Sequence, residues 1–311
     1  MRSASSSFSR LAWGVLGWNV IVILWGAFVR ASGSGAGCGA HWPLCNGVVV
    51  PRQARLETLI ELSHRLSSGV ALILGVWLLV AAVRRFPAGA LARRAAIWSF
   101  GLLLGEAAIG AGLVLFRLVT DNESTARAIA MAAHLANTNF LLAALTCCAL
   151  AGGAEGTASW HRRSARLEER STLTVLLALV VVGATGAIAA LGDTLYPASS
   201  LAEGLRQDLS ATAATLLRLR ALHPFVAVGA AALAFFWAAR CRDRFPGREI
   251  EGPARWVVAL VPIQIVAGVV NLTLLAPIWM QLVHLLLADL LWIAVVALGF
   301  AVRWVPTPRG S

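Results

Sequence analysis

The sequence predicts an all-α membrane protein in which eight transmembrane helices form two tandem four-helix bundles. Hydrophobic residues make up 59% of the 311-residue chain and charged residues only 13%, and the mean hydropathy is +0.76. A soluble chain of this length cannot bury so much apolar surface. The apolar runs are each about 20 residues long, as a helix crossing a bilayer requires, and too uniformly apolar for barrel strands. The expected spans are 11–30, 60–83, 95–116, 128–151, 171–191, 220–239, 254–275 and 280–302.

An internal repeat divides these spans into two halves. The matched features are Gly26 with Gly186, Glu106 with Gln264, Gly110 with Gly268, His134 with His284, and Asn139 with Asp289. An even number of spans per repeat gives both halves the same orientation, so we expect a pseudo-twofold axis along the membrane normal. The predicted halves are residues 1–151 and 171–311, joined by a cytoplasmic linker over 152–170.

The basic residues predict the orientation of the chain. All 26 are arginines, and the net charge is +11. Most of them fall in segments that would lie inside the cell if the N-terminus does, so both termini are expected in the cytoplasm. This placement argues against a nucleic-acid partner. Arg2 and Arg10 precede the first span as in a signal peptide, but the repeat of that span in the second half predicts that it is retained.

Four of the six histidines occupy equivalent places in the spans. Each lies in the first third of an even-numbered span, toward the outer leaflet: His64, His134, His223 and His284. A neutral imidazole at the edge of hydrocarbon is unfavourable unless its lone pair is used. A single one would more often be a packing residue, but four at matched positions argue for ligands. Within each half, two helices can present imidazoles across the bundle, and haem iron takes two axial nitrogens from opposite sides. Zinc needs four N or S ligands, and neither pair has further ones nearby. The sequence therefore predicts two haem sites.

The two halves differ beside their first histidine. Glu61 precedes His64 by three residues, so both lie on one helix face, whereas Arg220 takes the equivalent place before His223. A carboxylate at the membrane edge can act as a base or stabilise a cation. The alternative is an exposed interfacial residue or a partner of Arg65.

Polar residues within the spans give weaker signals. Glu106 and Gln264 occupy matched positions, as do Asn139 and Asp289. Interhelical hydrogen bonds are the default interpretation, and a proton path is the alternative. We expect Asp193 to begin an outer loop.

The first outer loop carries two cysteines. Cys38 and Cys45 flank six residues in the compartment where disulfides persist. A bridge across so short a loop contributes about 2.5 kcal/mol by the chain-entropy model. We expect a structural or redox-active disulfide rather than two free thiols, and we expect Cys147, Cys148 and Cys241 to be packing residues.

These features together resemble the haem A synthase family of bacterial and mitochondrial membranes, over essentially the whole chain. The segments that carry the resemblance are Gly26-Ala27-Phe28-Val29-Arg30 with Ser32-Gly33-Ser34-Gly35, Trp42-Pro43-Leu44-Cys45-Asn46-Gly47, Glu61 with His64-Arg65, Gly186-Ala187, Gly192-Asp193-Thr194-Leu195, and the His284 span.

The resemblance implies a reaction and two haem sites. The family oxidises a ring methyl of haem O to a formyl group, giving haem A for terminal oxidase biogenesis. By that resemblance, His64 and His134 hold the substrate haem O, with Glu61 beside the reacting carbon as a catalytic residue. His223 and His284 hold a haem b cofactor.

The resemblance also has implications for the loop, the partners and the location. Cys38 and Cys45 match the family's outer-loop pair, whereas His41 stands where many relatives carry a proline–acid pair, which leaves its role open. Expected partners are the lipid bilayer, haem O, a haem O synthase, an electron acceptor and a second copy of the chain. The expected location is the cell membrane.

Two other functions fit part of the pattern. A dihaem cytochrome b-type electron-transfer protein accounts for the four histidines, but not for a carboxylate and a cysteine loop in one half only. A haem exporter predicts loosely held haem and no formyl product.

Overall fold

The structure has the predicted all-α membrane class. The computed structural model describes residues 7–52, 54–154, 158–163, 166–210 and 215–308, and within them eight helices are long and apolar enough to cross a membrane. These are α1 Ser7–Ala31, α2 Leu56–Arg85, α3 Leu91–Leu115, α4 Thr125–Ala154, α5 Arg166–Leu195, α7 Thr215–Arg244, α8 Arg248–Thr273 and α9 Ile278–Arg303. The shorter elements are the 3-10 turn η1 Ser34–Ala36, strand β1 Ala158–Arg162, helix α6 Leu201–Leu209 and strand β2 Trp304–Pro308.

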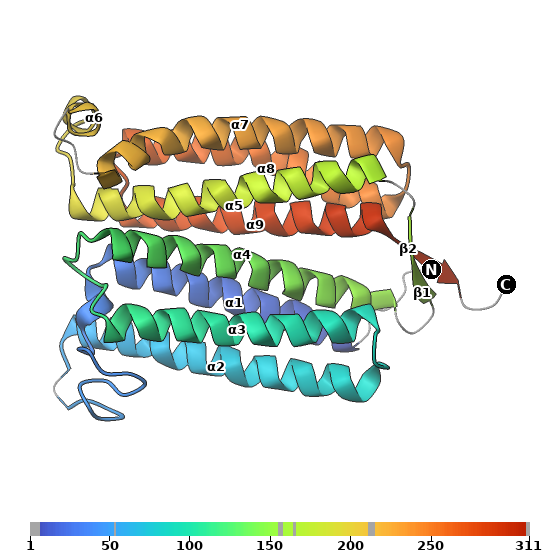
Figure 1. Ribbon diagram of the computed structural model, residues 1–311, viewed down its shortest axis with the longest axis horizontal. Coiled ribbons are helices and arrows are strands. Elements are labelled where there is room, and N and C mark those ends of the chain that lie inside the picture. The colour runs from blue at the N-terminus through green and yellow to red at the C-terminus, as the bar shows by residue number, and fades with distance from the viewer. Residues whose placement is uncertain (1–6, 53, 155–157, 164–165, 211–214, 309–311) are drawn as a thin grey trace.

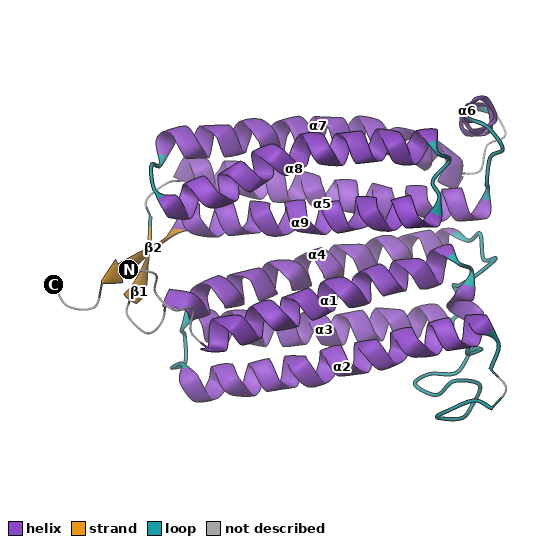
Figure 2. Ribbon diagram, turned by 180° about the vertical axis from the view of Figure 1, so that it is seen from behind, coloured by secondary structure: helices purple, strands orange, loops and turns teal. Residues whose placement is uncertain are grey.

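The long helices lie in two groups of four, side by side (Figure 1). Helices α1 to α4 pack around one another, as do α5, α7, α8 and α9. The groups meet where α1 and α4 face α5 and α9, as the view from behind also shows (Figure 2). The disulfide loop and α6 lie at one end of the molecule, here called the loop end, and β1 and β2 lie at the other, the sheet end. The pseudo-twofold axis between the groups stays a prediction.

The helices extend beyond the spans expected from hydropathy. Helix α4 ends at Ala154 and α5 begins at Arg166, so both enter the expected linker 152–170. Hydropathy marks the apolar stretch, whereas backbone hydrogen bonding continues into polar flanks. Within the linker, β1 pairs antiparallel with β2 near the end of the chain, a pairing that hydropathy did not predict. Arg2 and the ends of the predicted halves, residues 1 and 311, lie outside the described residues.

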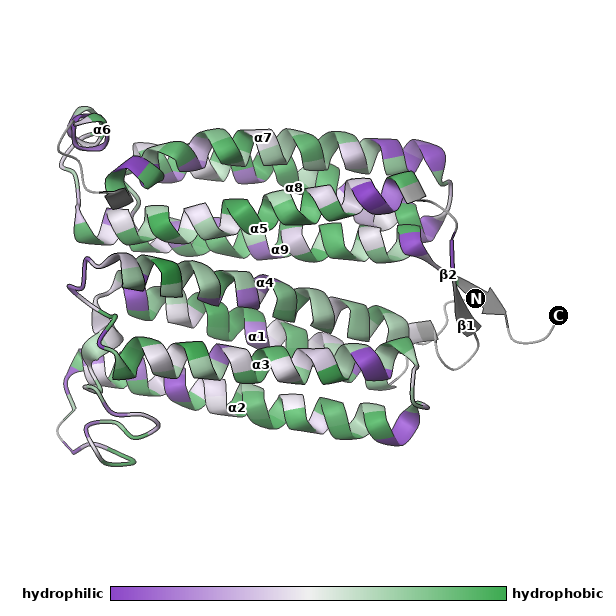
Figure 3. Cartoon of the chain, in the orientation of Figure 1, coloured by the Kyte–Doolittle hydropathy of each residue, from purple (hydrophilic) through white to green (hydrophobic). Residues whose placement is uncertain are grey.

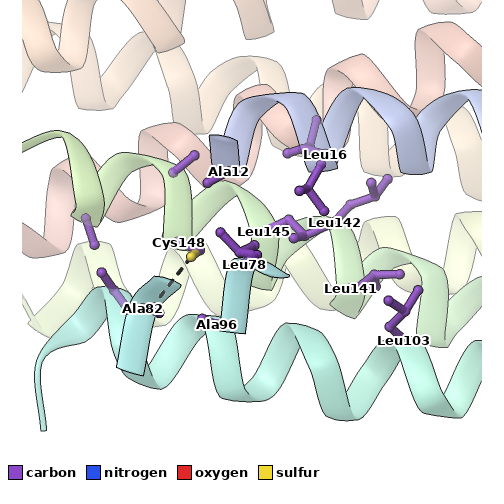
Figure 4. Packing of buried hydrophobic residues seen from close by; sticks show 14 of the residues in the cluster. Ala12, Leu16, Leu78, Ala82, Ala96, Leu103, Leu141, Leu142, Leu145 and Cys148 are labelled. Atoms are coloured by element: carbon purple, nitrogen blue, oxygen red, sulfur yellow. Dashed lines mark hydrogen bonds between the residues drawn. The ribbon is translucent and has the colours of Figure 1, made fainter. Parts of the chain in front are cut away.

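Each helix group has its own hydrophobic core, and the core of the first group extends to α9 of the second. Side chains from α1, α2, α3 and α4 form one cluster, which includes the fully buried Leu142 and Leu145 (Figure 4). Trp292 of α9 belongs to this cluster although α9 is in the other group, and its indole N–H donates to the Asn139 carbonyl of α4 over 2.7 Å. Apolar residues also cover much of the lengths of the helices, and polar ones gather toward their ends (Figure 3). This exposed apolar surface is the part that lipid covers.

One arginine joins the groups at the loop end. The guanidinium of Arg30, on α1, donates to the Ala190 carbonyl and the Thr194 hydroxyl of α5, and to the Gln281 side chain of α9, each over 2.7 Å. Because three donors of one rigid guanidinium bind two helices of the second group, Arg30 fixes the relative positions of the groups.

Candidate haem sites and the disulfide loop

The four histidines are divided between the two helix groups. His64 lies on α2 and His134 on α4, both in the first group. His223 lies on α7 and His284 on α9, both in the second group. All four remain within the first third of their helices. Among the described residues, no group of three or more His, Cys, Asp or Glu side chains is placed to hold a metal ion.

Three of the imidazoles lie against the backbone of a glycine on a neighbouring helix. A Cβ atom added to the glycine would approach the ring Cε1 to 3.0 Å for Gly26 and His64, 3.1 Å for Gly186 and His223, and 3.1 Å for Gly268 and His284. Ordinary carbon contacts are about 3.5 to 4.0 Å. These glycines therefore create space for the rings, a requirement that sequence reading noted as a repeat but did not explain.

The fourth imidazole faces a carboxylate instead. His134 Nδ1 lies 3.0 Å from Oε2 of Glu106, on α3, at the distance of an ion pair rather than as an aligned hydrogen bond. The amide of Asn137 donates to Oε1 of Glu106 over 2.6 Å, and the Thr138 hydroxyl lies 3.1 Å from both carboxylate oxygens. Of the two interpretations for Glu106, the structure supports the interhelical one.

The second pair has neutral partners. The Thr185 hydroxyl lies 3.0 Å from Nδ1 of His223. The amide of Gln264 donates to the His284 carbonyl over 3.2 Å and lies 3.4 Å from its Nε2. The buried Nδ1 atoms of His64 and His284 have no hydrogen-bond partner.

The donor set fits haem iron. Contacts at Nδ1 of His134 and His223 leave Nε2 of each ring for a metal, the arrangement in which a second group orients a ligating imidazole. The buried unpartnered nitrogen of His64 and the glycine spaces beside three rings also fit a group that is bound between the helices.

Glu61 is buried, with 3% of its surface exposed, and is held by the disulfide loop. Its Oε2 accepts the Cys38 N–H over 2.8 Å, and its Oε1 accepts Nε of Arg65 over 3.1 Å and a second Arg65 N–H. The expected pairing with Arg65 is therefore present, but the residue is not exposed. The described hydrogen bonds of Glu61 therefore join it to Cys38 of the loop and to Arg65 of its own helix, and none joins it to His64.

The loop is closed by the expected disulfide between Cys38 and Cys45, both fully buried. The Arg65 guanidinium also donates to the carbonyls of His41 and Leu44, over 2.6 and 2.7 Å. In these bonds His41 contributes its backbone. The loop and the start of α2 therefore form one unit centred on the Glu61–Arg65 ion pair.

In the second half, the position equivalent to Glu61 holds an arginine, Arg220, so its charge is opposite. Arg220 donates to Asp208 of α6 over 2.7 Å and to Asp193 of α5 over 3.3 Å. Asp193 lies in the last turn of α5 rather than beginning a loop. Glu61 and Arg220, each three residues before a histidine, therefore both bind a segment at the loop end: Glu61 binds Cys38, and Arg220 binds Asp208. Sequence reading missed these contacts because the two residues of each contact are 12 or more positions apart in the chain.

These features define a multi-pass helical membrane protein with two half-buried histidine pairs and a disulfide-closed loop bound to the helix of one of them. Residues 9–296 match the cytochrome oxidase assembly protein family COX15-CtaA, and the chain belongs to that family. The membership predicted from the resemblance to haem A synthases is confirmed.

Similar proteins include one from Thermus thermophilus named protoheme IX farnesyltransferase, 43% identical over 296 residues, or 95% of this chain and 48% of the relative. The chain therefore spans about half the length of that relative. Proteins from Bacillus cereus and Bacillus anthracis, both named heme A synthase, are 45% identical over 97 residues, or 31% of each chain.

Proposed function

We propose that this protein is a haem A synthase, which oxidises one ring methyl of haem O to a formyl group. The observation that carries the proposal is the asymmetry of two otherwise similar histidine pairs. Among the described residues, the helix of His64 carries a buried carboxylate, Glu61, that is joined to a disulfide-closed loop, whereas Arg220 takes the equivalent place before His223. Membership of the COX15-CtaA family and the likeness to proteins named heme A synthase support it.

Each half of the chain has a distinct role in this proposal. The N-terminal half, residues 1–151, binds haem O between His64 and His134. The C-terminal half, residues 171–311, binds haem b between His223 and His284, and residues 152–170 join them. The glycine spaces beside the rings and the contacts that leave Nε2 of His134 and His223 free support these ligand sets. Haem b supplies one-electron redox chemistry in its site.

Glu61 acts at the methyl carbon. Two electrons leave the methyl group, one at a time, for the haem b of the second half and from there the electron acceptor, and one proton is lost. The cationic carbon that remains is attacked by water, with loss of a second proton, to give the alcohol. A second round gives a geminal diol, which loses water to form the aldehyde. The Glu61 carboxylate stabilises the cation or takes the proton of the attacking water. Its Oε2 accepts one described hydrogen bond, so a lone pair remains for that role.

The loop end faces outward and both termini lie in the cytoplasm of a cell-membrane protein. The arginine bias and the disulfide, which persists in an oxidising compartment, support this orientation. Haem O is the substrate, and the source of the formyl oxygen is water. A haem O synthase is the proposed neighbour, since a longer relative is named protoheme IX farnesyltransferase. An electron acceptor and a second copy of the chain complete the proposed partners.

Haem extraction tests the proposal. Purified protein should release haem b together with haem O or haem A on chromatography. Haem b alone would favour a dihaem cytochrome b-type protein, and loosely held haem with no formyl product would favour an exporter.

The Glu61→Ala variant should bind both haems but form no haem A. Glu57→Ala removes an exposed carboxylate one turn away and is the matched control, which should retain activity. Full haem A output from Glu61→Ala would remove its proposed role.

A further inference from the structure

The two halves differ in what lies beside their second histidine. In the first half, the Glu106 carboxylate lies 3.0 Å from Nδ1 of His134 and is braced by Asn137 and Thr138, from the same helix as the histidine. The Asn137 amide also donates to the Leu102 carbonyl of α3 over 2.8 Å. Helix α4 therefore presents the imidazole together with two donors that hold the carboxylate beside it.

In the second half both the carboxylate and its braces are absent from the sequence. Gln264 takes the place of Glu106, and Leu287 and Ala288 take the places of Asn137 and Thr138. The amide of Gln264 donates to the backbone carbonyl of His284 and lies 3.4 Å from Nε2 of that ring rather than at Nδ1, and the Oε1 of Gln264 is buried without a hydrogen-bond partner. The first half therefore has both the carboxylate and the side chains that donate to it, and the second half has neither.

The rings are also placed differently. The His284 ring lies against Gly268, with 3.1 Å between Cε1 and a Cβ built there. At the matched Gly110 an added Cβ meets nothing within 4 Å. The His134 ring is therefore not packed on Gly110 and lies at the carboxylate instead. His134 and His284 therefore differ in their neighbours: a carboxylate for His134, and a glycine backbone for His284.

We infer that Glu106 is a positioning residue that makes His134 a stronger donor to iron than His284. This inference rests on the proposed coordination of haem by both histidines. When Nε2 of His134 binds iron, the ring proton is on Nδ1, which lies 3.0 Å from Oε2 of Glu106. A carboxylate in that place orients the ring and increases electron donation by the coordinating nitrogen. Stronger donation favours ferric over ferrous iron, so the first haem has a lower reduction potential than it would with an amide.

The difference gives electron flow a direction. A haem that is to be oxidised benefits from a low potential, and its acceptor from a higher one. The carboxylate lies in the half proposed to hold the substrate haem, and the neutral amide in the half proposed to hold haem b. Electrons therefore move from the first half to the second.

Reciprocal substitutions test the inference in the full-length purified protein. Glu106→Gln gives the first half the side chain of the second, and Gln264→Glu does the reverse. Each haem is titrated electrochemically with optical detection, and the first-half haem is identified by its loss in His134→Ala. Glu106→Gln should raise the reduction potential of the first-half haem. The expected change is at least tenfold in the equilibrium ratio of reduced to oxidised iron, equal to about 59 mV for one electron. Gln264→Glu should shift the second haem in the opposite direction.

Controls separate this inference from the proposed function. Glu57→Gln, a distant exposed carboxylate, should shift neither potential. Asn137→Leu, which removes one brace, should shift the first potential in the same direction as Glu106→Gln. Normal haem binding with unshifted potentials in both swap variants would overturn the inference and leave the proposed function standing. Retention of both haem spectra in His134→Ala would overturn the coordination and the inference together. If Glu106→Gln fails to bind haem, the reduction potential of the second haem in Gln264→Glu tests the inference. A lower potential supports the inference, and an unchanged or higher one overturns it.

Discussion

The glycine beside the His64 ring offers a sharp test of the first haem site. Replacing Gly26 by Ala places a methyl group 3.0 Å from Cε1 and 3.2 Å from Nε2 of that ring. The imidazole is rigid and sits between packed helices, so it must move by a few tenths of an ångström. Since Nε2 is the nitrogen proposed to bind iron, the movement changes the geometry of the haem site directly.

The size of the effect follows from this overlap. Inserting one methyl group into packed surroundings costs about 1 to 3 kcal/mol. If the whole cost falls on the haem-bound state, haem binding weakens by about 5-fold to 150-fold, at 1.4 kcal/mol per tenfold change. The second-half site, beside Gly186, should be unaffected.

The assay is titration of haem into haem-depleted protein, followed by Soret absorbance, with pyridine haemochrome spectra to tell the two haems apart. Gly17→Ala on the same helix is the matched control, because a Cβ there meets nothing within 4 Å. Binding in Gly26→Ala equal to that of Gly17→Ala and wild type would refute the argument that Gly26 makes space for His64.

Other contacts in the structure give three further predictions. Replacing Cys38 and Cys45 by Ser should destabilise the loop by about 2.5 kcal/mol, seen as faster hydrogen exchange over 37–46; unchanged exchange would contradict it. Arg30→Gln removes a charged donor that joins the helix groups, so the free energy of unfolding should fall by about 3 kcal/mol. A melting curve identical to that of wild type would contradict this prediction. Hydrogen bonds from Ser199 lower the pKa of Glu203, so the stabilisation of the start of α6 is present above the ordinary carboxyl pKa and is lost as pH falls through the lowered value. The protection of amides at the start of α6 against hydrogen exchange, relative to the intrinsic rate at each pH, should therefore fall on acidification in wild type but not in Glu203→Gln.

Hydropathy and spacing predicted much of the fold and all of the paired histidines. Eight apolar runs of bilayer length leave only helices as a solution, since backbone groups in lipid must bond within their own segment. The repeat placed His134 and His284 at equivalent positions before any contact was known. The disulfide also followed from sequence, because Cys38 and Cys45 lie in the loop expected in an oxidising compartment, whereas Cys147, Cys148 and Cys241 lie within or at the inner ends of spans.

Contacts between distant helices were not predictable in this way. Its spacing from His64 placed Glu61 on the same helix face, and the family resemblance implied a place beside the haem. The structure adds that its carboxylate holds the disulfide loop through the Cys38 N–H and Arg65. The small elements α6 and β1 were missed because they are short and polar, without the long apolar periodicity that marks a span.

The sequence by itself determined that this chain has eight helices long and apolar enough to cross a membrane and two pairs of matched histidines, because those properties depend on length, hydropathy and spacing along the chain. Only the tertiary structure decided which neighbour each imidazole meets: glycine backbone for three of them, and the Glu106 carboxylate for His134. Such neighbours come from other helices, and their identity depends on the rotation and distance at which packed helices meet, which no local pattern specifies.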